Sequence, residues 1–316
     1  MAKLIEWREH IRRWYSRHDR YIILVTKFLM AVLVFWGINY NIGYMNELKH
    51  IYVVLLLAVV CAILPMQMMI FLSAALVLLH LYALSLRVAM IAAVMFLIMF
   101  LVYFRFEPKN GEYVIVTPLA FACQIPYVMP VITGLLKGPY SIISVIFGTV
   151  TYYFLSGVKI NAPVLRAAAT GEENVNEWAV TLNQVFGNKE MYLVLAAFVV
   201  AMIVVYNVRR MGIDHAWSIA IAAGILTQFL ILVTGYLALR TKEKIVWLII
   251  GCLLSGLISM VIEFFFFNLD YHRTERVQFE DDEYYYYVKA VPKVNLSSGE
   301  KTVQKIAGTE KREDED

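Results

Sequence analysis

Residues 50–104 read HIYVVLLLAVVCAILPMQMMIFLSAALVLLHLYALSLRVAMIAAVMFLIMFLVYF, and Arg87 is the only Lys, Arg, Asp or Glu among them. Residues 113–158 likewise contain a single charged side chain, Lys137. Because about 20 apolar residues span the hydrocarbon layer of a bilayer as a helix, uncharged stretches of this length indicate transmembrane helices. Hydrophobic residues make up 60% of the whole chain, which is more than a soluble core requires. The sequence therefore predicts an all-α, polytopic transmembrane helical bundle.

The transmembrane domain is expected over residues 21–269, with eight to ten spans. Its apolar segments are roughly 21–43, 50–64, 66–85, 88–106, 113–136, 138–158, 191–211, 215–239 and 245–269. Pro65 separates the second segment from the third, so these two form a tight hairpin or one broken unit.

The fifth apolar segment contains Pro118, Pro126 and Pro130. Each proline removes a backbone hydrogen bond and obstructs the preceding helical turn. Backbone groups left unpaired in this way are tolerated at membrane depth only against protein or a cavity. We therefore expect residues 118–130 to form a kinked or re-entrant element at the functional centre of the protein.

The two ends of the chain are polar. Residues 1–20 carry six Lys/Arg and combine them with an apolar stripe at helical spacing, which predicts an amphipathic helix on the membrane surface. A basic head favours a cytoplasmic N-terminus beside anionic lipid. If all nine segments cross, four loop Lys/Arg lie on one side and eight on the other, and the tail lies opposite the N-terminus. The totals for the two sides are then nearly tied, so the side of the tail depends on the number of crossings. We expect a plasma-membrane protein with both ends cytoplasmic.

The long loop expected at 159–190 contains Val175, Trp178, Leu182, Val185 and Phe186 at helical spacing. This pattern predicts a short helix that lies on the membrane surface or caps the bundle, with a substrate lid as the alternative.

The tail is predicted to begin with a juxtamembrane β-hairpin at 270–294. Residues 274–279 alternate polar and apolar side chains, and residues 284–291 are rich in strand-forming types. An isolated two-stranded hairpin is marginal in water. Residues 274–294 therefore require a surface, which the bundle's own loops, a second copy or a soluble partner could supply. The alternative, a disordered acidic spacer, suits residues 295–316, which we expect to be a disordered charged tail.

The sequence contains no recognisable catalytic or metal-binding motif. There is no HExxH, no Walker glycine loop, no GxSxG and no Cys/His cluster, so we expect no enzyme and no cofactor, although a lipid-modifying enzyme is a third option. The balanced charge makes nucleic acid a poor partner. Cys61, Cys123 and Cys252 lie in apolar segments and are interpreted as buried small side chains. His80 is interpreted as a hydrogen-bonded packing residue.

Polar residues within spans are informative because they cost free energy in lipid and usually face a protein interior or a cavity. Glu263 is the only acidic residue deep in an apolar segment, and Gln124 and Tyr127 flank Pro126. We predict Gln124, Tyr127 and Glu263 as substrate-binding residues. Glu263 is expected to be buried against another helix with its carboxyl group paired or protonated; an interfacial or structural role is the alternative. Further polar residues lie at Asn207, Thr227 and Gln228.

Residues 118–155, PLAFACQIPYVMPVITGLLKGPYSIISVIFGTVTYYFL, contain prolines and glycines at the ends of apolar runs. The stretch resembles the hairpins of membrane subunits such as energy-coupling-factor substrate-binding components and MreD-like proteins. In those families a run like GLLKGP (134–139) marks a tight interhelical turn. The resemblance covers a short part of the chain, and no ligand residues transfer through it.

Two functions follow from these observations. The first is a permease-like membrane subunit that binds or moves a small solute or a lipid-linked molecule. The alternative is a non-transporting membrane scaffold for envelope assembly or division. Transport predicts a polar cavity closing on Gln124, Tyr127 and Glu263, whereas a scaffold predicts a dry, tightly packed bundle.

Overall fold

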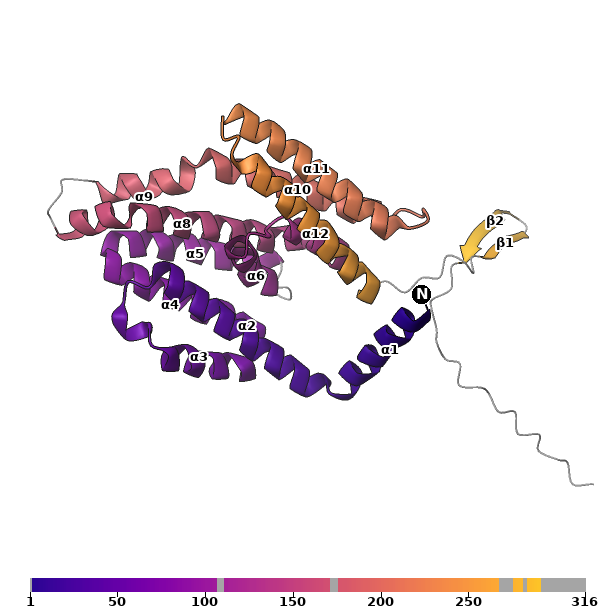
Figure 1. The fold of residues 1–316 in the computed structure, drawn as a ribbon, viewed down its shortest axis with the longest axis horizontal. Coiled ribbons are helices and arrows are strands. Elements are labelled where there is room, and N and C mark those ends of the chain that lie inside the picture. The colour runs from indigo at the N-terminus through magenta and orange to yellow at the C-terminus, as the bar shows by residue number, and fades with distance from the viewer. Residues whose placement is uncertain (1, 107–110, 171–175, 267–274, 281–282, 291–316) are drawn as a thin grey trace, which may run out of the picture. The chain divides into compact units, whose positions relative to one another are not determined.

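The computed structural model describes residues 2–106, 111–170, 176–266, 275–280 and 283–290 (Figure 1). The chain forms two compact units, which are described separately. The larger unit, Arg17–Phe267, is a helical bundle. The smaller unit consists of Met1–Ser16 and Asn268–Asp316.

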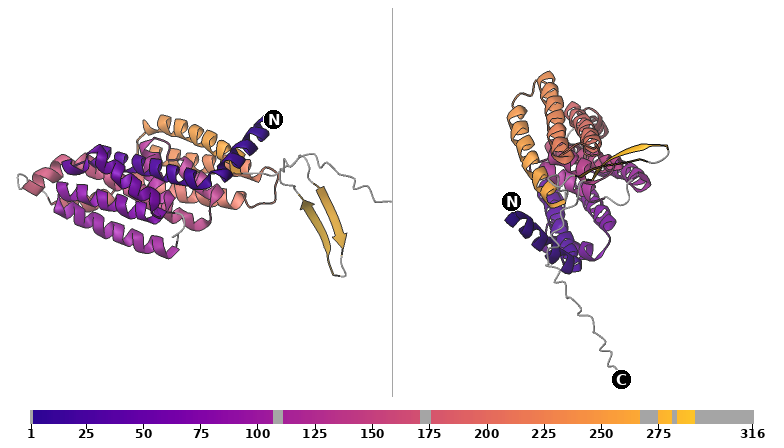
Figure 2. Two further views of the ribbon diagram at one scale, coloured as in Figure 1. Left: turned by 90° about the horizontal axis from the view of Figure 1, so that it is seen from below. Right: turned by 90° about the vertical axis from the view of Figure 1, so that its right-hand side faces the viewer.

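The helices of the larger unit are α2 (Asp19–Ile42), α3 (Ile51–Ile63), α4 (Met66–Leu84), α5 (Leu86–Phe106), α6 (Glu112–Ala122), α7 (Val128–Leu136), α8 (Ile142–Thr170), α9 (Glu177–Phe186), α10 (Lys189–Val208), α11 (Ala216–Ala238) and α12 (Lys244–Phe266). Short 3-10 turns, η1 (Asn46–Leu48) and η2 (Pro139–Ser141), precede α3 and α8. Figure 2 shows α2 to α5 on one side of the bundle and α10 to α12 on the other.

Seven stretches of described helix are long and apolar enough to cross a membrane: α2, α4, α5, η2 with α8, α9 with α10, α11, and α12. They fit the prediction of an all-α, multi-pass membrane protein. The helix α3, of 13 residues, and α6, of 11 residues, are too short to be counted among them. A total of eight to ten spans therefore stays a prediction.

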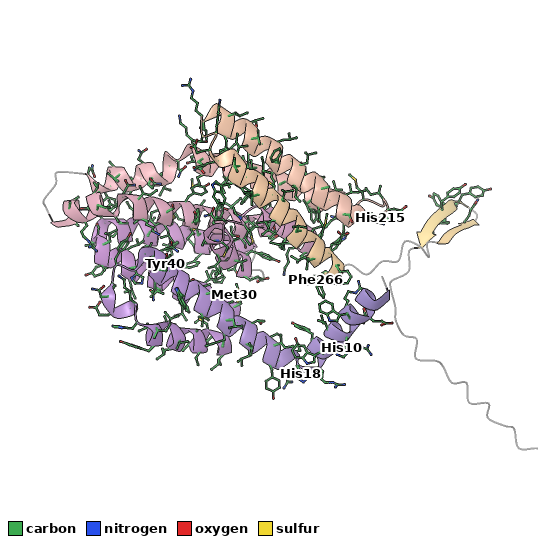
Figure 3. The ribbon with its side chains drawn as sticks, in the orientation of Figure 1. His10, His18, Met30, Tyr40, His215 and Phe266 are labelled. Atoms are coloured by element: carbon green, nitrogen blue, oxygen red, sulfur yellow. The ribbon has the colours of Figure 1, made fainter. Side chains whose placement is uncertain are left out.

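The bundle has two ends, and its helices alternate in direction between them. We call the end where α2 begins the proximal end, and the end where α4 meets α5 the distal end. Near the proximal end, the Lys27 ammonium donates to the carbonyl of Leu64, which follows α3, at 3.2 Å. Near the distal end, His80 of α4 and Asn39 of α2 are hydrogen-bonded at 2.7 Å. His215, just before α11, and Phe266, at the end of α12, mark the proximal end again (Figure 3).

The fifth apolar segment is broken, as its prolines predict. The helix α6 ends at Ala122 and α7 begins at Val128, with Pro126 in the break. Gln124 in the break adopts a left-handed backbone conformation, with φ 60°, which terminates α6. Pro130 is tolerated in the first turn of α7 because its missing N–H would have no helical acceptor there.

The two halves of this segment form a re-entrant hairpin, which we define as residues 112–136. The helix α6 runs beside α8 in the same direction: a Cβ at Gly148 would meet Thr117, and Phe121 stacks on Tyr152 with ring centroids 4.4 Å apart. The helix α7 runs beside α10, with Gly134 against Val205. Since α8 begins and α10 ends at the proximal end, the hairpin enters from that end and returns to it.

An ion pair closes the base of the re-entrant hairpin. Lys137, which follows α7, lies 3.2 Å from a carboxylate oxygen of Glu112, the first residue of α6. The two ends of the hairpin are therefore neighbours. The hairpin does not run from one end of the bundle to the other. The beginning of α2 and the end of α12 therefore lie at the same end of the bundle (Figure 1).

The prediction that a loop begins at residue 159 is wrong, because α8 continues to Thr170. The polar side chains there are satisfied by neighbouring helices: Lys159 donates to Asn41 of α2 at 3.0 Å, and Asn161 donates to Gln184 of α9 at 3.4 Å. These contacts allow polar residues to remain helical. The predicted short helix is present as α9, capped by Asn176, whose side chain accepts from two backbone N–H groups.

The outer surface of α9 is apolar. Its buried residues are Glu177, Thr181 and Val185, whereas Trp178 and Phe186 are exposed. Of the periodic apolar residues, Trp178, Leu182 and Phe186 therefore face outward and Val185 faces the bundle; apolar side chains on the outside are the arrangement expected of a helix in contact with lipid.

The smaller unit contains α1 (Ala2–Arg17) and two strands, β1 (Glu275–Glu280) and β2 (Tyr285–Ala290). The strands pair antiparallel, with Val277 opposite Val288 and Phe279 opposite Tyr286. A hairpin held close to the bilayer and an interfacial position for α1 stay predictions. The expected disordered tail, 295–316, and residues 270–274 and 291–294 lie outside the described residues.

Candidate binding site at the tip of the re-entrant hairpin

The tip of the re-entrant hairpin, residues 123–127, lies midway along the bundle, where Pro126 is buried and Tyr127 half-buried while Cys123 and Gln124 are exposed. Gln228 of α11 donates from its side-chain amide to the carbonyl of Tyr127 at 3.1 Å. The Tyr127 ring packs edge-on against Phe198 of α10, with centroids 6.4 Å apart, and covers Gly251 of α12. Phe198, Gln228 and Gly251 all lie well inside their helices. The tip is therefore far from both ends of the bundle.

The lengths of α6 and α7 agree with this depth. The helix α6 has 11 residues and α7 has 9, which correspond to about 16 and 13 Å of rise. Each is close to half of the ~30 Å hydrocarbon layer. A hairpin of this size reaches the middle of a bilayer without crossing it.

A group of polar side chains lies close to the same tip. Lys244, the first residue of α12, contacts Glu190 of α10 at 2.6 Å, and Tyr153 of α8 donates to the other oxygen of Glu190 at 3.4 Å. Tyr153 follows Tyr152, which stacks on Phe121 just before the tip, and Tyr236 of α11 shares a side-chain hydrogen bond with Tyr127.

Three buried polar atoms of α11 and α12 have no hydrogen-bond partner among the described residues. They are Oε1 of Gln228 and the hydroxyl oxygens of Ser255 and Ser259. Ser255 lies one turn after Gly251, on the same buried face of α12. Leaving such a group unsatisfied costs about 1–3 kcal/mol, so buried polar atoms are normally paired with protein, water or a ligand. Gln228 and Ser255 are the two of these residues that lie close enough to the tip to exchange hydrogen bonds with a polar molecule there.

The structure brings together two of the three residues predicted to bind substrate. Gln124 and Tyr127 share the break between α6 and α7, with Gln124 exposed and Tyr127 half-buried. Glu263 lies about three turns beyond Gly251 on α12, about 18 Å along the helix, near the proximal end. The expected convergence of all three side chains is absent.

The environment of Glu263 matches its prediction in part. Its carboxylate accepts a hydrogen bond from the Ser218 hydroxyl of α11 at 2.6 Å, so the carboxyl group is paired with another helix. The side chain is only half-buried, which corrects the expected full burial. The reason is its place in the last turn of α12, where less of the bundle covers it.

Two grooves among the described residues lie away from these three side chains. One groove, of about 200 Å³, lies between the beginning of α8 and the end of α10. Another, of about 470 Å³, lies between α4 and α5 and is lined by Ala75, Leu78, Leu79, Tyr82, Ala89, Met90 and Ala93. Neither contacts Gln124, Tyr127 or Glu263.

Two other buried polar side chains have structural partners. His80 is fully buried; one ring nitrogen accepts from the backbone N–H of Met45 at 3.2 Å and the other pairs with Asn39, which confirms its interpretation as a packing residue. Glu177 is buried and accepts from Ser85 and, at 2.8 Å, from Arg87. Among the described residues, no group of three or more His, Cys, Asp and Glu side chains is placed to hold a metal ion.

The cysteines follow their prediction with one exception. Cys61 and Cys252 are buried, but Cys123 is exposed. Cys123 ends α6 at the break, where the chain turns and no neighbouring helix covers the side chain.

Comparisons with protein-family models, with curated proteins and with solved structures find no match to this chain.

Proposed function

We propose that the protein is a permease-like subunit of the plasma membrane, which binds or moves a small solute or a lipid-linked molecule. The observation that supports this proposal is the meeting of the re-entrant tip with unpaired, buried polar atoms of Gln228 and Ser255. Broken helices and unsatisfied polar groups are expensive in a lipid environment, and membrane proteins use them where a solute is bound.

In this proposal the site is closed from both ends. The re-entrant hairpin separates the tip from the proximal end, and the Glu190–Lys244 ion pair lies on the other side of the tip, at the beginnings of α10 and α12. A solute moving through the bundle would require the ion pair to open and the hairpin to shift. Tyr127 and Gln124 would contact the solute at the tip, whereas Glu263 would act near the proximal end.

We further propose that the proximal end faces the cytoplasm. With the hairpin as a non-crossing element, α2 to α5, α8 and α10 to α12 make eight crossings, so both ends of the chain lie on one side. With this topology the segments between the spans place five Lys/Arg on the side of the N-terminus and eight on the other side, and the six Lys/Arg of residues 1–20 make the side of the N-terminus the more basic.

The proposal is tested by the access of water to the tip. In a variant with Cys61, Cys123 and Cys252 replaced by alanine, Gln124→Cys is introduced and the full chain is reconstituted into vesicles. A membrane-impermeant, charged thiol reagent should modify this cysteine. The matched control is Leu253→Cys on α12, at a similar depth but pointing away from the bundle, with 66% of its surface exposed. It should stay unmodified because lipid surrounds it.

Equal protection of both cysteines under all conditions would contradict a water-accessible site at the tip and would favour the second function. That function is a non-transporting scaffold for envelope assembly or division. It is favoured by the positions of the two grooves, neither of which reaches the tip.

In the scaffold proposal, residues 274–294 carry the contact with a partner or a second copy. Tyr284, Tyr285 and Tyr287 are strongly exposed, and aromatic side chains are enriched at protein interfaces. Deleting residues 274–294 should then abolish a specific association, detected by cross-linking in membranes, while the bundle stays inserted. Rapid amide exchange throughout this stretch in the intact protein would argue against the contact.

A further inference from the structure

Two arginines at the proximal end hold the base of the re-entrant hairpin. Arg209, which follows α10, donates from one guanidinium nitrogen to the carbonyl of Leu135 and from the other to the carbonyl of Lys137 at 2.6 Å. Arg210 donates to the Tyr206 hydroxyl at 2.7 Å. Both guanidinium groups lie over the Tyr206 ring, 5.1 and 5.3 Å from its centroid.

The positive charge of this pair is not neutralised by any carboxylate in the described part of the chain. The nearby Glu112 is already paired with Lys137. Arg209 uses two of its five N–H groups on carbonyl oxygens, which carry no net charge, and Arg210 is exposed. The two guanidinium groups both lie close to the Tyr206 ring and carry like charges that repel, so an anion bound near them would be favourable.

An apolar groove begins directly beside the two arginines. It has a volume of about 200 Å³ and is lined by Pro139, Ile142, Met202, Ile203, Tyr206 and Asn207. This volume is below the ~300–1,000 Å³ typical of sites for whole small molecules. Ile203 is 48% exposed, so the groove opens on the outside of the bundle, where a membrane helix contacts lipid. A groove of this kind has room for part of an acyl chain.

We propose that this surface is a binding site for an anionic phospholipid. The phosphate lies against Arg210 and the free N–H groups of Arg209, and the first part of one acyl chain fills the groove. The assignment to an anionic lipid rests on charge complementarity, because a guanidinium pair matches a phosphate through parallel hydrogen bonds. Basic pockets between helices at the cytoplasmic side of membranes bind such headgroups.

The site joins the lipid to the re-entrant hairpin. Arg209 connects the end of α10 to the last carbonyls of α7, so a phosphate that neutralises Arg209 and Arg210 stabilises the position of α7. This inference requires only that the bundle lies in a membrane, and it is independent of any transport activity.

The test uses native mass spectrometry of the full chain, equilibrated with equal amounts of dioleoylphosphatidylglycerol and dioleoylphosphatidylcholine. The wild-type protein should retain the anionic lipid preferentially. Arg210→Gln should reduce this preference about fivefold, the effect expected for one basic residue near an anionic lipid. Arg105→Gln, at the proximal end of α5 but away from the groove, is the charge-matched control and should leave the preference unchanged.

A second variant tests the acyl-chain part without altering charge. Ile203→Phe fills the groove and should also weaken retention of phosphatidylglycerol. Because Ile203 is 48% exposed, the larger side chain should not disturb the folding of the bundle. Equal loss in Arg105→Gln and Arg210→Gln would overturn the proposal. So would unchanged retention in Ile203→Phe, or displacement of the lipid by inorganic phosphate at matched concentration, since the site would then recognise phosphate alone.

Discussion

The packing of the re-entrant tip against α12 makes a specific prediction for Gly251→Ala. A Cβ at residue 251 would lie 2.5 Å from Cδ2 and 2.6 Å from Cε2 of the Tyr127 ring. These contacts are much shorter than a van der Waals separation, so the ring must move. It is restrained by Phe198 on one side and by the hydrogen bond to Tyr236. Overpacking of this kind costs about 1–3 kcal/mol.

The matched control is Gly256→Ala, in the same helix and one turn and a half further along. There the new Cβ would lie 3.2 Å from Cδ1 of Ile225, the flexible end of a side chain. It should be nearly neutral, because the isoleucine can adjust and alanine favours the helix over glycine. The free energy of unfolding in detergent, followed by far-ultraviolet circular dichroism during denaturant titration, should therefore separate the two variants.

A double-mutant cycle with Tyr127→Ala identifies the cause of the effect. When the ring is absent, Gly251→Ala should lose most of its cost, giving a coupling energy of about 1–2 kcal/mol. If Gly251→Ala destabilises equally with and without the Tyr127 ring, or if it matches Gly256→Ala, the described contact between the tip and α12 is wrong.

Three further predictions concern polar contacts within the bundle. Glu177→Ala should lower the free energy of unfolding by about 1–3 kcal/mol, and not more, because the Arg87 side chain is 53% exposed and can be solvated; an unchanged midpoint in denaturant would contradict the contact. His80→Leu should cost a similar ~1–3 kcal/mol, since it leaves two buried hydrogen-bonding groups without their partner, and chemical denaturation measures it. Lys244→Gln should accelerate modification of a cysteine at residue 124 by an impermeant thiol reagent, because it removes the ion pair with Glu190; an unchanged rate would show that this pair does not control access.

The break in the fifth apolar segment was predictable from the sequence because it has a local cause. Three prolines within a short apolar run prevent a regular helix, whatever surrounds them. The direction of the second half was not predictable, because it depends on contacts between residues far apart in the chain. Phe121 with Tyr152, and Arg209 with Leu135, are such contacts.

The candidate site was predicted only in part for the same reason. Gln124 and Tyr127 could be identified from the sequence because they flank Pro126 in an apolar segment. Glu190 and Lys244 could not, because they lie in the first turns of their helices, where charged residues are common at the membrane interface. Their pairing with each other and with Tyr153 requires the fold. Glu263 was conspicuous as an acidic residue among phenylalanines, although its position near the end of α12 keeps it away from the tip.

The re-entrant hairpin is the central claim, and the sidedness of its two ends tests it most directly. Single cysteines replace Glu112, at the beginning of α6, and Gly138, after α7, in the cysteine-free chain; Gly212→Cys marks the proximal end and Lys242→Cys the distal end. An impermeant thiol reagent, applied to one side of sealed vesicles of uniform orientation, should label positions 112, 138 and 212 from the same side and position 242 from the other. Labelling of positions 112 and 138 from opposite sides would mean that this segment crosses the membrane, which would contradict the re-entrant hairpin.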